Sequence, residues 1–161
     1  MTKLRVAIVT ETFLPCVNGV ATRLDRSVRE MTAAGDEVLV VAPGSGSWEH
    51  HGAQVFGAGG FPLPIYREVS VALPRPAVSR ALKAFRPDVI HVVNPAVLGW
   101  SGIYYARTRR VPLICSFHTQ LPRYLQHYGL GFMERPLWDF LRSAHNQARV
   151  NLCISRPMER E

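Results

Sequence analysis

The chain alternates short, almost continuous apolar runs with longer stretches in which apolar residues recur every three or four positions. Runs of the first kind are typical of strands buried on both faces, and stretches of the second kind are typical of amphipathic helices. Their repeated alternation favours one fold class, an α/β domain with a parallel sheet flanked by helices. The predicted strands are Leu4–Thr10, Glu37–Ala42, Gln54–Gly57, Asp88–Val93, Pro112–Phe117 and Arg149–Ile154.

Two stretches of helical period are expected to pack on this sheet. The first follows the first strand, and Gly35 is placed to end it. Its apolar positions are Val17, Val20, Ala21, Leu24, Val28 and Met31. The second, Phe132–Ala148, is predicted to face the core through Met133, Leu137, Phe140, Leu141, Ala144 and Ala148. The segment 58–74 is rich in Gly and Pro and is predicted to be a loop with one extended piece.

Composition is consistent with a single folded domain over residues 1–161, since 47% of the residues are hydrophobic and 19% are charged. The longest apolar stretch, Pro95–Ala106, is shorter than the about 20 residues that a membrane-spanning helix needs. Glu11 and Pro15 follow the first apolar run too closely for a secretory signal, so we expect a cytoplasmic protein.

Ligands of open parallel sheets bind beyond the carboxyl ends of the strands, so the loops that leave each strand are the places to inspect. The first loop ends in Asn18 and Gly19 at the start of a predicted helix. Backbone N–H groups at a helix start form an anion site where a diphosphate could dock. On these residues alone, Asn18 as a simple helix cap and Gly19 as a turn residue are nearly as good a reading.

The loop after Pro112–Phe117 opens with His118, whose imidazole can donate to a sugar hydroxyl or a phosphate near neutral pH. A functional role is favoured for His118, whereas His127 and Tyr128 fit packing or surface positions better. Asn94, after Asp88–Val93, could hold an acceptor hydroxyl or be plain turn chemistry before Pro95. His91, inside that strand, is predicted to be a hydrogen-bonded core histidine.

Several other site classes lack their signatures. The fingerprint of dinucleotide-binding domains is missing after the first strand, and there is no Walker A sequence. No spacing of His, Cys or carboxylates suggests a metal site, and no Ser or Cys lies in a nucleophile elbow. The three cysteines, Cys16, Cys115 and Cys153, form no C-x-x-C pair and are predicted to be reduced thiols. The sequence therefore predicts binding groups without a metal or a catalytic triad.

The net charge of +7 suggests phosphate-bearing partners. One predicted helix places Arg75, Arg80, Lys83 and Arg86 on one arc, opposite Ala77, Val78, Ala81, Leu82, Ala84 and Phe85. The basic arc could contact an anionic membrane surface, or it could be the solvated side of a helix packed on the sheet. Arg107, Arg109 and Arg110 end another predicted helix, where cations suit its dipole. Nucleic-acid binding ranks last because no reader motif accompanies the charge.

Four motifs in register resemble the N-terminal domain of family-four retaining glycosyltransferases. They are Arg5–Pro15 with Asn18-Gly-Val20, Ala34–Val38, Arg86–His91, and Ser116-Phe-His-Thr119 followed by Tyr124 and Tyr128. Within that family the chain looks most like the mannosyl- and sulfoquinovosyl-type enzymes that glycosylate lipid or polyprenol-linked acceptors. The resemblance implies a Rossmann-like domain, the N-terminal half of a GT-B fold, that works without metal or cofactor on a nucleotide sugar such as GDP-mannose.

The resemblance also implies roles for individual residues. The backbone at Gly19, with Asn18, would approach the donor diphosphate, and His118 would contact the transferred sugar or stabilise its developing charge. Asn94, Thr119 and Tyr124 would face a lipid or glycan acceptor. The family's donor-binding C-terminal domain is missing from this sequence, so the chain alone is expected to transfer little or nothing. The alternative is a non-catalytic binding module for an anionic lipid or a sugar phosphate. With either function, the protein could lie peripherally on the inner face of the cell membrane.

Overall fold

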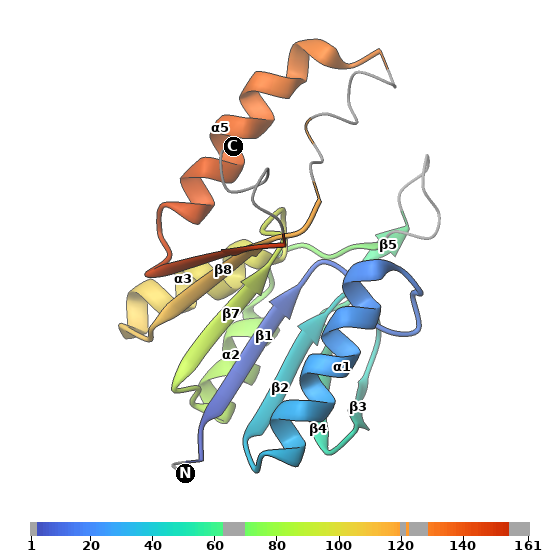
Figure 1. The fold of residues 1–161 in the computed structure, drawn as a ribbon, viewed down its shortest axis with the longest axis vertical. Coiled ribbons are helices and arrows are strands. Elements are labelled where there is room, and N and C mark those ends of the chain that lie inside the picture. The colour runs from blue at the N-terminus through green and yellow to red at the C-terminus, as the bar shows by residue number, and fades with distance from the viewer. Residues whose placement is uncertain (1–2, 63–69, 120–121, 123–128, 155–161) are drawn as a thin grey trace.

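The computed structural model describes residues 3–62, 70–119, 122 and 129–154, and it forms an α/β domain built on one large sheet (Figure 1). The strands are β1 (Arg5–Thr10), β2 (Glu37–Ala42), β3 (Ser47–His50), β4 (Ala53–Gly57), β5 (Phe61–Pro62), β6 (Ser70–Val71), β7 (Val89–Val93), β8 (Leu113–Phe117) and β9 (Val150–Cys153). The helices are α1 (Gly19–Ala33), α2 (Pro76–Phe85), α3 (Gly99–Arg109), the 3-10 turn η2 (Gly131–Met133) and α5 (Glu134–His145).

The large sheet has the order β3-β4-β2-β1-β7-β8-β9, and every pair in it is parallel except β3 with β4. Without the antiparallel edge strand β3, the order from β4 to β9 is that of a doubly wound Rossmann-like sheet. The connection from β4 to β7 carries the chain from one half of the sheet to the other, so the strand order reverses between β1 and β7. The carboxyl ends of these two strands therefore flank the switch point, where ligands of such sheets bind.

Two apolar cores form because successive residues of each buried strand point to opposite faces. On one face, Leu24 and Val28 of α1 pack against β1 and β2 residues such as Ile8 and Val40. On the other face, the α2 and α3 residues Leu82 and Ile103 belong to a core with alternate residues of the same strands. Figure 1 shows α1 on one side of the sheet and α2 with α3 on the other.

Helix α1 has well-defined ends. The side chain of Asn18 accepts a hydrogen bond from the Ala21 N–H at 2.9 Å and so caps the start. At the other end, Gly35 has φ 95°, and the N–H groups of Gly35 and Asp36 donate to carbonyls of the last helical turn. This is the Schellman arrangement that the Gly35 signal predicts. Val17, which the periodicity placed in the helix, lies before it and is 85% exposed.

The predicted strands are all confirmed, each within one residue at its ends. Strand β3 is not among the predictions because its side chains alternate between exposed and half-buried, so it has no continuous apolar run. The predicted loop 58–74 contains the short antiparallel pair β5 and β6. Among the described residues, no helix has both the length and the apolar character to cross a bilayer.

The basic helix and the last helix give mixed outcomes. Helix α2 buries Val78, Leu82 and Phe85 as predicted, but Ala84 is exposed. Helix α5 faces the core as predicted through Leu141 and Ala144, which are buried, but only part of its apolar face is covered. Met133 and Phe140 are exposed. The reason is that α5 lies over the edge of the sheet, next to β8 and the exposed strand β9, where little surface is available to cover it.

Gly102 of α3 allows this helix to approach the sheet closely, and this makes a testable prediction. A methyl group at position 102 would lie 2.9 Å from Cγ2 of Val9 and 3.0 Å from Cγ2 of Val92, whereas one at Gly19 would meet nothing within 4 Å. Gly19→Ala adds the same methyl group to a helix where it meets nothing, so it is the control for the added methyl, although at the first helical position it gains less helix propensity than Gly102→Ala does in a helix interior. We expect Gly102→Ala to lower the free energy of unfolding by about 1–3 kcal/mol relative to Gly19→Ala, as measured in urea. Equal stabilities would contradict the close packing.

Candidate functional site

The candidate site lies at the carboxyl ends of β1, β7 and β8, beside the start of α1. The loop after β1 leads through Asn18 into α1, the loop after β7 begins at Asn94, and the loop after β8 begins at His118. The Arg23 side chain, about one turn after Gly19 in α1, lies 3.1 Å from Nδ1 of His118. The helix that carries Gly19 and the loop that carries His118 therefore meet at the same edge of the sheet.

At the start of α1, the observed hydrogen bonds of Asn18 are those of a helix cap. Its side-chain oxygen accepts from Ala21, and its side-chain nitrogen donates to Thr12 Oγ1 at 2.9 Å. Gly19 faces open space at its Cα, and the first turn of the helix carries no acidic residue. Because Gly19 has no side chain and the first turn has no carboxylate, a ligand anion can approach the backbone N–H groups here.

Asn94 holds the beginning of the loop after β8. Its φ of 49° lies in the left-handed region, which Asn tolerates better than most residues. Its side-chain oxygen accepts the His118 N–H at 2.7 Å, and its side-chain nitrogen donates to Thr119 Oγ1 at 3.3 Å. The structure thus brings together Asn94, His118 and Thr119, with Asn94 bonded to the other two.

The His118 ring belongs to a chain of hydrogen bonds whose proton positions follow from Arg23. An arginine side chain can only donate, so His118 Nδ1 accepts from it, and His118 Nε2 carries the ring proton. His118 Nε2 lies 2.9 Å from Ser116 Oγ, and Ser116 Oγ lies 2.8 Å from Nε2 of His91. The order of donation is therefore Arg23 to His118, His118 to Ser116, and Ser116 to His91. The prediction of a hydrogen-bonded His91 is confirmed.

Both histidines are kept neutral by their surroundings. Burial is the main cause that lowers the pKa of His118 to about 4, and the positive charge of Arg23 adds to it. Burial also lowers the pKa of His91 to about 4, with further contributions from His118 and Arg23. At neutral pH the His118 ring therefore offers one N–H donor and one lone pair rather than a positive charge.

Glu11 connects the loop after β1 to the start of α3. Its carboxylate accepts hydrogen bonds from the N–H groups of Ala96 at 3.1 Å, Leu98 at 3.2 Å and Gly99 at 2.8 Å. Burial raises the pKa of Glu11, and the backbone hydrogen bonds oppose that shift. This carboxylate takes the place of a capping side chain at the start of α3, and it fixes the two loops that flank the switch point.

Some of these site residues could be selected from the sequence, and others could not. Tyr124, His127 and Tyr128 lie outside the described residues. Glu11, Arg23 and Ser116 were not singled out as site residues, although Glu11 and Ser116 stand inside the quoted motifs. Arg23 gives no local signal, because its partner His118 is 95 residues away in the chain.

A broad open hollow also exists at the opposite end of the sheet. It is lined by residues around the amino ends of β1 and β2, including Lys3, Asp36 and Glu37. Lys3 and Glu37 form an ion pair of 3.0 Å there. Because ligands of doubly wound sheets bind at the carboxyl ends, this hollow is not the candidate site despite its size.

The sheet order and the open helix start at its switch point place this protein in the Rossmann-like α/β class, whose ligands bind at that point. Residues 17–161 match the model of glycosyltransferase family 4. The chain belongs to this family.

Three glycosyltransferases resemble the chain over most of its length. The chain is 35% identical over 158 residues to a GDP-mannose-dependent alpha-mannosyltransferase of Mycolicibacterium smegmatis. This match covers 94% of the chain and 42% of the relative. A GDP-mannose-dependent alpha-mannosyltransferase of Corynebacterium glutamicum is 32% identical, over 94% of this chain and 38% of the relative. A sulfoquinovosyl transferase of Arabidopsis thaliana is 33% identical, in a match that covers 86% of this chain and 28% of the relative. The chain thus spans well under half the length of these relatives.

The neutral histidines predict how stability depends on pH. The folded state keeps both rings neutral down to about pH 4, whereas an unfolded chain takes up these protons near the ordinary histidine pKa of 6.5. Between these values the unfolded state binds more protons, so the free energy of unfolding should fall as the pH is lowered from 6.5 towards 4. Urea unfolding at several pH values measures this slope. The slope should be smaller in a His91→Asn/His118→Asn variant, and an unchanged slope would show that these rings do not cause it.

Proposed function

We propose that this chain is the N-terminal, acceptor-side half of a retaining glycosyltransferase that moves a hexose from a nucleotide sugar to a lipid or glycan acceptor. The observation that carries the proposal is the placement of His118 at the switch point, joined through Arg23 to the helix that begins at Gly19. Mannose from GDP-mannose is the proposed donor sugar, because two of the relatives are GDP-mannose-dependent enzymes. The donor is a substrate, and no cofactor is proposed.

In this proposal the donor diphosphate lies at the start of α1. Gly19 lets the phosphate oxygens approach backbone N–H groups at the positive end of the helix dipole, and Asn18 orients that first turn. Arg23, about one turn further along, adds a positive charge on the same side as His118. Together these groups would stabilise the negative charge that grows on the departing nucleotide.

His118 is the proposed catalytic residue. Its Nε2–H now donates to Ser116, and it can exchange this hydrogen bond for one to a hydroxyl of the transferred sugar. The low pKa keeps the ring neutral, so it would act as a hydrogen-bond donor in a dry site rather than as a general acid. Asn94, Thr119 and Tyr124 are proposed on the acceptor side, where the observed bonds of Asn94 favour an indirect role through His118 and Thr119.

A second polypeptide segment would supply the other wall of the cleft. The chain spans 42% of its relative from Mycolicibacterium smegmatis, which leaves room for a donor-binding C-terminal domain. The exposed apolar side chains Val150, Leu152 and Ile154 in and after β9 are consistent with a surface that such a domain would cover. Glu11 is an unsuitable nucleophile for a covalent intermediate, because both its oxygens already accept backbone hydrogen bonds.

Peripheral contact with an anionic membrane, at its cytoplasmic face, is the second part of the proposal. The exposed cations Arg80 and Lys83 of α2 lie beside a shallow groove that is shared with Tyr104 and Arg109 of α3. Tyr104 is 67% exposed. Cations around an exposed aromatic ring suit the headgroup region of a bilayer, where a lipid acceptor would be found. The same surface would serve a non-catalytic module that binds anionic lipid or sugar phosphate.

His118→Ala tests the catalytic role when the chain is joined to a matching C-terminal domain and supplied with GDP-mannose and a lipid acceptor. We expect kcat to fall roughly 100-fold, if the hydrogen bond from His118 to the sugar hydroxyl strengthens in the transition state as those of other preorganised donors do. Near-UV circular dichroism and the melting temperature control for misfolding. Unchanged transfer by a folded variant would remove His118 from the mechanism.

Gly19→Ala tests the diphosphate site in the same assay. The new methyl group meets nothing in the protein within 4 Å, so stability should be kept or slightly raised. It would stand where the donor approaches the backbone, and we expect the KM for the donor to rise roughly 10-fold, equivalent to about 1.4 kcal/mol of binding. An unaltered KM would place the diphosphate elsewhere.

Vesicle sedimentation tests the membrane contact. Replacing Arg80 and Lys83 by Ala should weaken binding to vesicles rich in anionic lipid by roughly 30-fold, at about 1 kcal/mol for each cation near such a surface. Replacing Arg26 and Arg29 of α1 by Ala, which removes two exposed cations from the opposite side of the sheet, is the control. Equal recovery of the original protein with neutral and anionic vesicles would contradict the contact.

A further inference from the structure

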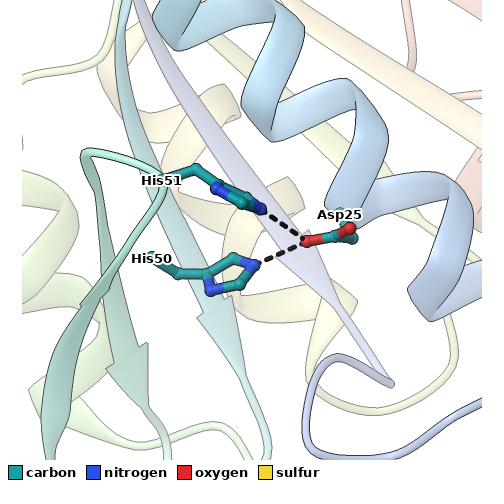
Figure 2. A group of neighbouring side chains, drawn as sticks. All are labelled: Asp25, His50 and His51. Atoms are coloured by element: carbon teal, nitrogen blue, oxygen red, sulfur yellow. Dashed lines mark hydrogen bonds and ion pairs between the residues drawn. The ribbon is translucent and has the colours of Figure 1, made fainter.

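Two neighbouring histidines and one carboxylate converge on the α1 side of the sheet, outside the candidate site. His50 ends β3, His51 follows it in the turn to β4, and Asp25 lies in the middle of α1. Nε2 of His50 lies 2.6 Å from Oδ1 of Asp25, and Nε2 of His51 lies 3.2 Å from the same oxygen. Figure 2 shows both rings pointing from the hairpin towards the single carboxylate on the helix.

The hairpin backbone brings the two rings together. β3 and β4 are joined by the two-residue turn His51-Gly52, in which φ is 50° and 79°, as a type I′ turn requires at both central positions. Histidine is one of the few non-glycine residues enriched at positive φ, so it can stand at the first of these positions. The ring of Phe13 packs edge-on against His50 with centroids 5.9 Å apart, and the two imidazole rings lie 4.2 Å apart.

We propose that Asp25, His50 and His51 form a binding site for a first-row divalent transition metal ion, with Zn²⁺ as the best-suited ion. The three ligand atoms all lie within 4.8 Å of one another. In a tetrahedral zinc site with bonds of about 2.0–2.1 Å, neighbouring ligand atoms are roughly 3.3 Å apart. The Asp25–His51 distance of 3.2 Å already fits, and the Asp25–His50 pair would need to open by roughly 0.7 Å.

The donor set favours this class of metal. Imidazole nitrogen suits zinc, copper, iron and nickel, whereas magnesium and calcium prefer oxygen ligands only. Asp25 adds a carboxylate oxygen, which zinc accepts beside imidazole nitrogens. Side-chain exposures between 26% and 39% leave the cluster open to solvent, so water can complete the coordination. The two Nε2 atoms would bind the metal as lone pairs, with each ring proton on Nδ1.

Such an ion would fasten the β3–β4 hairpin to α1. Asp25 is two residues from Arg23, so the bound metal would also restrict the helix that carries Arg23 and Gly19. The site departs from the sequence prediction of no metal. The adjacent histidines were visible in the sequence, but Asp25 is 25 residues away from His50 and meets it only in the fold. The inference does not depend on the proposed transferase function.

Zinc titration of the untagged chain, with Ser in place of Cys16 and Cys153 to exclude thiol ligands, tests the site. We expect one Zn²⁺ per chain by calorimetry, and a rise in melting temperature of roughly 5–10 °C at a zinc concentration about 100 times Kd. In imidazole NMR spectra, the His50 and His51 signals should move while those of His118 stay in place. Magnesium at the same concentration should produce neither effect.

His51→Asn is the decisive variant. It keeps the turn, because Asn-Gly is the preferred sequence of a type I′ turn, and it removes the imidazole ligand. The metal-free variant should be at least as stable as the original chain, yet bind zinc roughly 100-fold more weakly. Asp25→Asn should lose zinc binding to a similar extent, and Glu49→Gln should bind normally. The proposal is overturned if the original chain binds no zinc, or if His51→Asn and Asp25→Asn respond to zinc as the original chain does.

Discussion

The parallel pairing of β1 with β2 on one side and with β7 on the other is the constraint on which the rest of the structure depends. Residue by residue, Val6–Val9 pair with both neighbours, and Ala7, Ile8 and Val9 are fully buried. This pairing places the ends of β1 and β7 side by side, and Glu11 then ties the two following loops together through the start of α3. The pairing of β1 with β2 and β7 therefore sets the positions of Gly19 and Asn94, and Asn94 holds His118 by accepting its backbone N–H.

The hydrogen-bond chain from Arg23 to His91 shows how the site is both stable and available. Both ring nitrogens of His118 already have a protein partner, so this imidazole is satisfied in the folded chain. A ligand that bonds to this ring must replace one of these partners, and the exchange costs little because one hydrogen bond is traded for another. Ser116 is the easier partner to replace, since its hydroxyl can rotate and keep its bond to His91.

Much of the fold could be predicted from the sequence because its signals are local. Continuous apolar runs identified the parallel strands, and Gly35 marked the end of α1 through its positive φ. Strand β3 was not predicted, because an edge strand needs no continuous apolar run. The exposed part of the apolar face of α5 was not predicted either, because periodicity identifies such a face but not how much of it the sheet covers. For the site, His118 and Asn94 could be selected by their place after a strand. Arg23 could not, since it lies inside a helix and its partner His118 is 95 positions away. Glu11 also follows a strand, but its bonds to the start of α3 could not be predicted, because those residues are 85 or more positions away.

Strand β9 has a practical consequence for work on the isolated chain. It is the outermost strand of the large sheet within the described residues, and all four of its residues are exposed, Val150 and Leu152 among them. An edge strand with apolar side chains and free backbone groups is a template for pairing with another strand. Solutions of the isolated chain should therefore be kept dilute, because concentration would favour edge-to-edge self-association and, with time, aggregation.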